Sequence, residues 1–260
     1  MHPDWIRPAD LPAGIGAVFT TRAGGVSVAP WSGLNLGDHV GDDPAAVAEN
    51  RRRLAAALGA RPVFLRQVHG CEVVRLDAAS ADAPVRSADA CWTTEPGVAC
   101  CILVADCLPV LFAAPGGRGV AAAHAGWRGL AAGVLQATAR ALAEGAGCRT
   151  GELRVWLGPC IAQADFEVGP DVLQAFGVHP DEVAALHTSS GGDVRGPARH
   201  FVPGRPGRWQ ADLPGLARDR LAALGIARPS APERCTDDVR LYSFRRQGAT
   251  GRFAGCIWLR

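Results

Sequence analysis

The stretch VACCILVADCLPVLFAAPGGRGVAAAHAGWRG, residues 98–129, decides how the rest of the chain is arranged. It contains two short apolar runs, Ala99–Val104 and Gly119–Ala123, and each is followed at once by reactive side chains. Continuous apolar runs of this length favour strands that are buried on both faces. Because the turn-forming Pro115–Gly117 lies between the runs, we expect them to pair as a hairpin.

The reactive residues that end these runs are a thiol and an imidazole. The first run leads into Asp106 and Cys107, and the second leads into His124. In a hairpin, Cys107 and His124 would lie close together. Cysteine and histidine are ligands that zinc and copper prefer, and they are also the partners of a thiol nucleophile and its base. The pattern therefore leaves a metal site and a Cys–His nucleophile both open.

The composition predicts one well-packed domain spanning residues 1–260. Of the 260 residues, 48% are hydrophobic and 20% are charged, so a large core is available. No repeat and no clear linker divides the chain. A formal net charge of +2 gives no argument for nucleic acid or an anionic membrane as a partner. No apolar run approaches the ~20 residues of a membrane span, and the first residues do not resemble a signal peptide.

Arginine is the basic residue throughout. All 27 basic residues are arginine, which excludes a Schiff-base lysine and a phosphate-binding Walker lysine. Any phosphate or carboxylate must therefore be held by arginine or by backbone amides. The nine cysteines are odd in number and several lie inside apolar runs, which predicts a reducing cytoplasm and no disulfide framework.

Further elements follow from local signals. Asp43 and Pro44 are typical of a helix start, and Gly59 of a helix end. The remaining expectations are a strand over 14–21, a helix over 130–143, a surface loop over 191–207, a proline-rich turn before Cys235, and two final strands over 241–246 and 250–259.

His69 is a third candidate ligand. It follows the strand-like run Pro62–Leu65 and precedes Gly70. Three protein ligands with an open fourth position are typical of catalytic zinc. Because the separations of His69, Cys107 and His124 do not match a zinc finger, a shared metal site and three unrelated polar groups both stay open.

Several strings of sequence resemble the laccase-domain, or YfiH-like, family. They are TTRAGGVS (20–27), NRRRL (50–54), QVHG (67–70), ADCLPVLF (105–112), HAGWRG (124–129), GPCI (158–161), FEVG (166–169), YSFRR (242–246) and TGRFAGCIWL (250–259). Members of this family were first described as polyphenol oxidases and later as purine nucleoside phosphorylases. The resemblance covers nearly the whole chain and implies an α/β fold: a layered α/β/β/α sandwich with mixed sheets.

The resemblance also implies a chemistry. It implies zinc held at His69, Cys107 and His124, with phosphorolysis of adenosine, inosine, guanosine and methylthioadenosine and deamination of adenosine. Family motifs often carry tyrosine where this chain has Phe166, so a hydroxyl role at that position is not carried over. They often carry a small residue where this chain has Cys160, which can add a thiol near the site.

Phosphorolysis needs an anion clamp, a contact to ribose and an acid or Lewis acid for the purine. For the clamp we expect Arg51 first, as a catalytic residue, and then the substrate-binding Arg22 and Arg128. We expect Asn50 to bind a sugar hydroxyl or the base.

Two residues beside the expected ligands have open roles. Asp106 can orient a ligating histidine, shuttle a proton or cap nearby amides in a turn. Trp127 can stack on the purine or pack in the core.

Cys107 is expected to be essential for catalysis as a ligand, because a zinc-bound thiolate is a poor nucleophile.

Three alternatives remain open. A Cys–His amidase or hydrolase acting on cell-wall peptides would use Cys107 as nucleophile. A copper polyphenol oxidase fits a Cys-His-His set, but the chain has seven histidines and no His-x-His pair for a further copper cluster. The third is a zinc-stabilised binding protein without catalysis. The expected partners are a purine nucleoside and phosphate, with no nucleic acid and no membrane, in a monomer or weak dimer.

Overall fold

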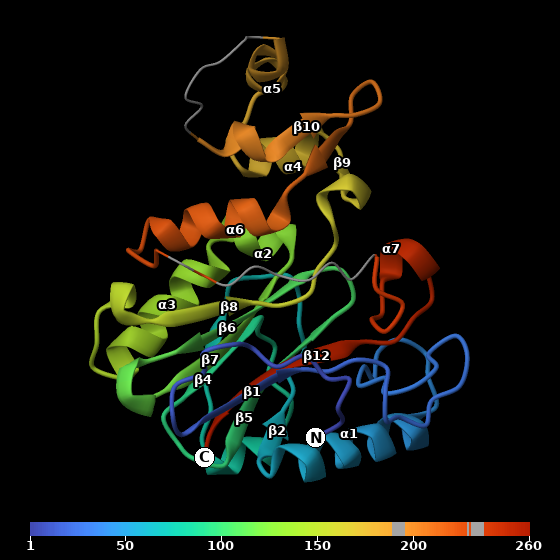
Figure 1. Cartoon of the computed structure of the whole chain (residues 1–260), viewed down its shortest axis with the longest axis vertical. Helices are drawn as coiled ribbons and strands as arrows, with labels where there is room; N and C mark the ends of the chain where they lie inside the picture. Colours follow the sequence, from blue (N-terminus) through green and yellow to red (C-terminus); the bar gives the residue numbers. More distant parts are fainter. Residues whose placement is uncertain (189–195, 228, 230–236) are drawn as a thin grey trace.

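Two β-sheets lie face to face at the centre of the molecule, and helices cover both outer faces (Figure 1). The computed structural model describes residues 1–188, 196–227, 229 and 237–260. The first sheet is ordered β1-β12-β5-β2. Its strands are β1 (Ile15–Phe19), β12 (Phe253–Leu259), β5 (Val98–Val104) and β2 (Arg61–Val63).

The second sheet is ordered β3-β4-β7-β6-β8, and a small third sheet is ordered β10-β11-β9. The strands of the second sheet are β3 (Val73–Arg75), β4 (Ala90–Thr93), β7 (Val120–Ala125), β6 (Leu108–Ala113) and β8 (Arg154–Leu157). Those of the third are β10 (Phe201–Pro203), β11 (Trp209–Ala211) and β9 (Glu167–Val168). The two large sheets mix parallel and antiparallel pairs, as predicted.

The helices lie on the two outer faces and in a projecting lobe, except α7, which lies apart from both. They are α1 (Pro44–Leu58), α2 (Trp127–Ala132), α3 (Val134–Gly145), α4 (Pro170–Ala175), α5 (Pro180–Thr188), α6 (Leu213–Ala222) and α7 (Phe244–Gln247). Short 3-10 turns lie at Ala78–Ala81, Pro115–Gly117, Thr150–Glu152, Gln163–Asp165 and Pro197–His200. With α1 on one face and α2, α3 and α6 on the other, the α/β/β/α layering is confirmed.

Strand β5 shows why its sequence is apolar without interruption. Ala99, Cys101 and Leu103 pack toward α1 on the outer face of the first sheet. Cys100 and Ile102 point the other way and pack against the second sheet. Because successive side chains of a strand alternate between faces, a strand with both faces buried needs apolar residues at every position.

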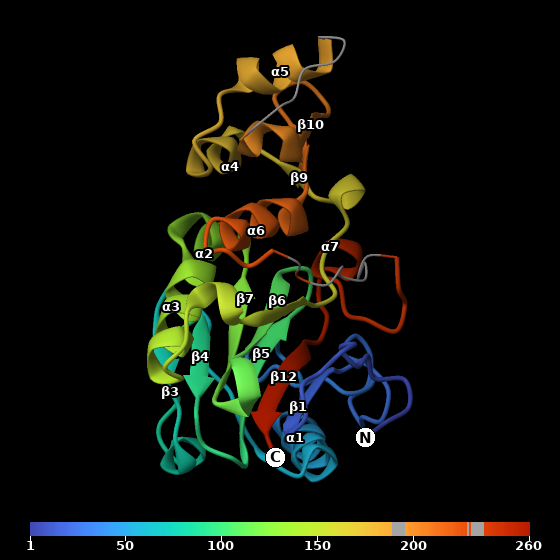
Figure 2. The same cartoon turned by 60° about the vertical axis from the view of Figure 1, so that its left-hand side comes forward.

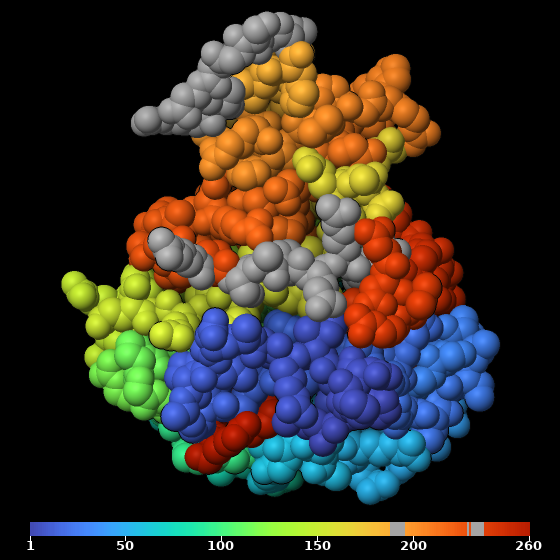
Figure 3. All heavy atoms as spheres, in the orientation of Figure 1, coloured from blue at the N-terminus to red at the C-terminus, as the bar shows by residue number. Residues whose placement is uncertain are grey.

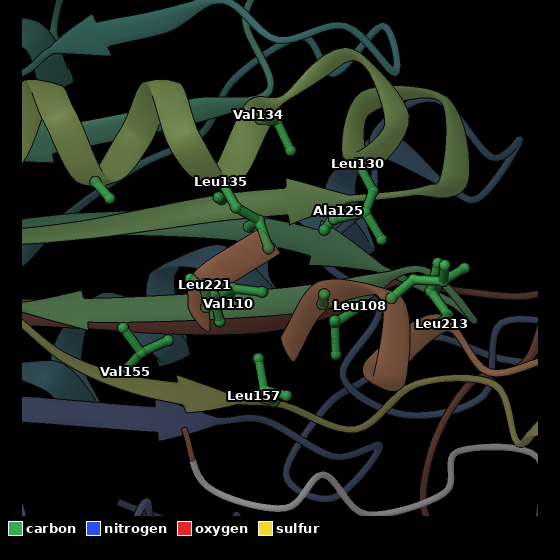
Figure 4. Packing of buried hydrophobic residues seen from close by; sticks show 14 of the residues in the cluster. Leu108, Val110, Ala125, Leu130, Val134, Leu135, Val155, Leu157, Leu213 and Leu221 are labelled. Atoms are coloured by element: carbon green, nitrogen blue, oxygen red, sulfur yellow. The ribbon is translucent and has the colours of Figure 1, made fainter. Parts of the chain in front are cut away.

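The outer face of the second sheet packs against α3 and α6 (Figure 4). Val110 of β6 faces Leu135 of α3 and Leu221 of α6 within one buried cluster. In β7 the outward positions include Ala121 and Ala123, whose small side chains let α3 approach the sheet closely.

The predicted hairpin between residues 99–104 and 119–123 is wrong. Strand β7 pairs antiparallel with β6, which the sequence analysis did not separate from the run before it. Strand β5 belongs to the other sheet. The segment Ala105–Cys107 therefore carries the chain from one sheet to the next, and Asp106 takes a left-handed φ of +98° there. Because the strands before and after this crossing are both fully buried and apolar, the sequence pattern does not show where one strand ends and the next begins.

Two further elements differ from expectation. The helix predicted over 130–143 is divided at Gly133, whose φ of +96° ends α2 before α3 begins. Residues 241–246 do not form a strand; Ser243 accepts a hydrogen bond from the backbone N–H of Arg246 (3.2 Å) and caps α7. The start of α1 at Asp43 and Pro44 and its end at Gly59 are confirmed.

A lobe formed by β9, α4, α5, β10 and β11 projects from the body beyond α6 (Figures 2 and 3). Of the loop predicted over 191–207, residues 191–195 lie outside the described residues, and the remainder contains a 3-10 turn and β10. Apart from Pro229, the segment of the turn predicted before Cys235 also lies outside them. Within the described part, the helices lack the length and apolar character needed to cross a bilayer. The single domain over 1–260 stays a prediction.

Candidate metal centre

His69, Cys107 and His124 converge at the ends of the two large sheets. Their ligand atoms all lie within 4.8 Å of one another. The Cys107 Sγ lies 3.9 Å from His69 Nε2, and the two imidazole rings are T-shaped with centroids 4.8 Å apart. Cys107 comes from the crossing between sheets and His124 from β7, while His69 lies between β2 and β3. This group of two imidazoles and one thiol could hold a metal ion.

A buried carboxylate just before β4 organises both histidines. Asp89 is fully buried, and its Oδ1 accepts hydrogen bonds from the backbone N–H of His69 (2.9 Å) and from His124 Nδ1 (2.8 Å). Its Oδ2 accepts from the backbone N–H groups of Val68 (3.1 Å) and Gly70 (2.7 Å). Since Nδ1 of His124 is occupied, Nε2 is the nitrogen left for a metal. Asp89 also holds the bend at His69, whose φ is +60°.

The charges of this cluster depend on one another. Burial raises the pKa of the Cys107 thiol, but the His124 charge and hydrogen bonds from both imidazoles outweigh burial and bring the pKa to about 6. Burial lowers the pKa of His124, but Cys107 and Asp89 outweigh it and raise that pKa to about 9. Without metal, the residues therefore form a thiolate–imidazolium pair near neutral pH, and the thiolate is the form that binds metal.

The backbone at Gly126 packs so closely against the ligating residues that no side chain fits at this position. A Cβ on Gly126 would lie 2.9 Å from the His69 ring and 3.1 Å from the Cys107 Sγ. A side chain at position 126 would therefore push the ligands apart. The donor set, the anchored tautomer of His124 and this close approach together fit a metal ion such as zinc.

The cluster opens into a cavity of about 440 Å³. The aromatic side chains Trp127, Phe166 and Phe244 line it together with two arginines, Arg245 and Arg252. The other lining residues are His39, Gln67, Leu103, Val104, Ala105, Asp106, Ile161 and Leu213. A cavity with apolar walls and a few convergent polar groups is typical of a small-molecule site.

Asp106 connects the crossing between sheets to the C-terminal helix α7. Its carboxylate accepts hydrogen bonds from Ser243 Oγ (2.6 Å) and from the backbone N–H of Arg245 (2.6 Å). It therefore positions the two α7 residues, Phe244 and Arg245, that line the cavity. Of the three roles left open by the sequence, this geometry favours the carboxylate that caps nearby amides.

Asn50 and Arg51 lie on α1, away from the cavity. Asn50 is fully buried; its Oδ1 accepts from Val26 N–H (2.9 Å), and its Nδ2 donates to Ser27 Oγ (2.9 Å) and the Asn35 carbonyl (2.9 Å). Arg51 donates through Nε to the Leu36 carbonyl (3.0 Å) and lines a separate cleft of about 150 Å³. Direct contact of either residue with a substrate in the cavity is not supported by these positions.

Arg22 and Arg128 also fall outside the described lining of the cavity. The Arg22 guanidinium lies 4.3 Å from the Tyr242 ring centroid and donates to the Leu241 carbonyl (3.3 Å). Arg128 is exposed and lies 4.3 Å over the ring of Trp127. Arg22 is held by neighbours outside the described lining, whereas Arg128 packs on Trp127, a lining residue, without lining the cavity itself.

The cationic groups at the cavity come instead from the C-terminal segment. Arg252 is half-buried and donates through Nη1 to the carbonyls of Thr250 (3.1 Å) and Gly251 (3.0 Å). Arg245 donates to the Asp165 carbonyl (2.5 Å). Neither arginine was predicted from sequence, although each lies in a string that carries the family resemblance. The same is true of Gly126, whereas Asp89 and His39 carry no local signal.

Cys160 is buried beside the cavity. Its Sγ lies 3.6 Å from the carbonyl of Ile161, which lines the cavity, and burial raises the pKa of the Cys160 thiol. The structure therefore places this thiol behind the wall, where it is a poor nucleophile.

The chain is similar to known proteins over its whole length. It is 50% identical to purine nucleoside phosphorylase PA4543 of Pseudomonas aeruginosa, with 100% of this chain and 98% of the relative covered. It is 41% identical to purine nucleoside phosphorylase YfiH of Escherichia coli, with 99% and 97% covered. The crystal structure of Neisseria meningitidis protein NMB0706 superposes with a TM-score of 0.84 at 38% identity and covers 98% of this chain and 99% of that one.

A family model described as multi-copper polyphenol oxidoreductase laccase matches residues 16–260. The match includes all three converging ligands, the arginines of the cavity and, apart from the first residue of β1, both large sheets. The chain therefore belongs to the laccase-domain, YfiH-like family, as its sequence motifs predicted.

Proposed function

We propose that this protein is a zinc-dependent purine nucleoside phosphorylase. The observation that carries the proposal is the cavity, in which a His-Cys-His cluster, two arginines and three aromatic side chains face one space. The names of the relatives from Pseudomonas aeruginosa and Escherichia coli support the same reaction. The proposed substrates are adenosine, inosine, guanosine and methylthioadenosine, with deamination of adenosine as a second activity.

His69, Cys107 and His124 would hold the zinc. When bound, zinc supplies a Lewis acid that polarises an oxygen atom and lowers the pKa of water. Asp89 keeps His124 in the tautomer that can bind, because it accepts the proton on Nδ1. The bend at His69 and the absence of a side chain at Gly126 keep the other two donors within reach of the same ion.

Arg252 and Arg245 would bind the phosphate. Both line the cavity, and Arg252 is partly withdrawn from water, where a charge-assisted hydrogen bond to phosphate is stronger. This assignment takes the place of Arg51, Arg22 and Arg128. Arginine forms two parallel hydrogen bonds to phosphate, so it also fixes the direction from which the nucleophile approaches ribose.

The purine would lie against the aromatic side of the cavity. Phe166 and Trp127 are half-buried, and Phe244 is 59% exposed at the start of α7. An exposed aromatic side chain at the edge of a cavity offers a face for stacking on a base. Phenylalanine at position 166 supplies that face without a hydroxyl.

The closing experiment measures products directly. Purified protein is incubated with adenosine, with and without phosphate, and scored for adenine, inosine and hypoxanthine. Adenine that appears only with phosphate supports phosphorolysis, and inosine without phosphate supports deamination. If neither appears with metal-loaded protein, the proposal is wrong.

Two alternatives have distinct outcomes in the same work. The Cys107–His pair also fits a Cys–His amidase acting on cell-wall peptides, which would cleave an amide in metal-free protein and lose activity on thiol alkylation. A His-Cys-His set also fits copper, so metal analysis that finds copper, with phenol oxidation, would favour a polyphenol oxidase. The cytoplasmic location and the monomer or weak dimer stay predictions.

A further inference from the structure

His39 is a side chain of the cavity that the proposed mechanism does not use. It lines the same cavity as His69 and Cys107, and its side chain is 60% exposed. It can therefore meet both a bound ligand and solvent. An imidazole in such a place can transfer a proton to a substrate and recover it from water.

A chain of polar contacts runs from His39 to helix α1. Its Nδ1 lies 3.3 Å from Asp38 Oδ1, and Asp38 Oδ2 lies 3.2 Å from an Nη of Arg51. The guanidinium of Arg51 is fixed by the Leu36 carbonyl and lies 4.3 Å over the ring of Phe64. A carboxylate that holds one imidazole nitrogen orients the ring and leaves the other nitrogen for proton transfer.

The loop that carries His39 rests on the proposed phosphate site. A Cβ on Gly37 would lie 2.8 Å from Arg252 Cγ, so the loop backbone packs directly on the arginine side chain. The Asn35 Oδ1 accepts from the backbone N–H groups of Gly37 (3.0 Å) and Arg252 (2.8 Å), and the Asn35 carbonyl accepts from Asn50. The loop and Arg252 are therefore held by the same hydrogen bonds from Asn35, and Asn50 of α1 holds Asn35 in turn.

We propose that His39 protonates the departing purine, and that Asp38, held by Arg51, positions the imidazole. The inference rests on the proposed phosphorylase function. The C1′–N9 bond breaks and its electron pair goes to the purine, while a phosphate oxygen forms the new bond to C1′. The proton on His39 Nε2 passes to purine N7. The proton that hydrogen phosphate loses on becoming an ester restores the imidazole through solvent, so atoms and charge balance.

The test compares guanosine with 7-methylguanosine in the metal-loaded enzyme with phosphate. The purine of 7-methylguanosine is already cationic and needs no proton to leave. We expect His39→Gln to lower kcat for guanosine by about 100-fold or more, the usual contribution of general acid catalysis. For 7-methylguanosine we expect less than a tenth of that loss. Asp38→Asn should show the same substrate dependence with a smaller loss of kcat and little change in KM.

His179 provides a matched control, because its Nδ1 lies 3.2 Å from Asp181 and its side chain is 68% exposed, outside the described lining of the cavity. His179→Gln should retain wild-type rates. Thermal melts of all variants establish that they fold.

A wild-type protein that, with phosphate, releases neither guanine from guanosine nor adenine from adenosine would overturn the proposed function and this inference with it. If the wild type is active and His39→Gln keeps its kcat for both substrates, or loses kcat equally for both, the inference is wrong while the proposed function stands.

Discussion

The cavity has two sides that are built differently. The metal wall consists of His69, Asp89, Cys107, His124 and Gly126, which lie in or beside the strands of the buried sheets. The loop wall consists of His39, Phe244, Arg245 and Arg252, which come from a surface loop and the C-terminal segment. Sites on rigid strands hold a geometry closely, whereas exposed loops adjust to a ligand. The donor atoms of the metal wall are therefore held in place before a ligand enters the cavity.

Asp106 joins the two walls. It follows β5, directly precedes the ligand Cys107, and accepts hydrogen bonds from Ser243 and from the Arg245 backbone at the start of α7. Its left-handed φ of +98° is unusual for a residue with a Cβ and is kept by these contacts. A shift in the position of Cys107 can therefore move Arg245, and the reverse, because Asp106 contacts both.

The largest effect is expected on the metal wall itself. Cys107→Ala removes the only thiolate among the three converging ligands, so bound metal and turnover should both be lost. The loss should exceed the roughly 10–100-fold that follows from changing a residue behind a ligand. Metal content by mass spectrometry and phosphorolysis rates check this. Full activity in metal-free Cys107→Ala would contradict the prediction that the three ligands hold a metal ion needed for turnover.

A smaller effect is expected from the residue behind the histidines. Asp89→Asn keeps the shape but weakens acceptance of the His124 and backbone protons, so metal affinity should fall by roughly 10–100-fold. Competition with a chelator measures the affinity. Asp77→Asn, which changes an exposed carboxylate that bonds to Ser80, is the matched control and should leave the affinity unchanged. Equal effects of both variants would remove the special role of Asp89.

The loop wall should respond in phosphate binding. Arg252→Gln removes a charged donor whose hydrogen bond to phosphate contributes about 1.5–3 kcal/mol, so KM for phosphate should rise about tenfold or more while metal content stays constant. Arg128→Gln, on an exposed side chain outside the described lining, should change KM by less than about twofold. The reverse result would assign the clamp to Arg128, the third of the arginines predicted from sequence after Arg51 and Arg22.

The smallest effect is expected in the pH dependence of Cys107 alkylation in the metal-free protein. The pKa of Cys107 is lowered to about 6 and that of His124 is raised to about 9, so the ion pair exists between these values. Below pH 6 the thiolate gains a proton, and above pH 9 the imidazolium loses one. Alkylation of Cys107 in metal-free protein should therefore rise about tenfold from pH 5 to pH 7. A midpoint near 9 instead would mean that the imidazoles do not stabilise the thiolate.

Sequence alone determined the features that depend on neighbouring residues. The ends of α1 follow from Asp43, Pro44 and Gly59, whose effects act within one turn of helix. The family and its layered fold followed from motifs spread along the chain. The three ligands were chosen by residue type and by their places after apolar runs.

Tertiary structure decided which residues meet. Every position from Val98 to Val104 and from Leu108 to Ala113 is buried, so polarity does not mark where the chain leaves one sheet for the other. Arg51 and Arg252 are equally cationic in sequence and both donate to backbone carbonyls, but Arg51 lines a separate cleft. Arg252, brought from the C-terminus by β12, faces the cavity. Long-range packing, which no local pattern encodes, fixes that choice.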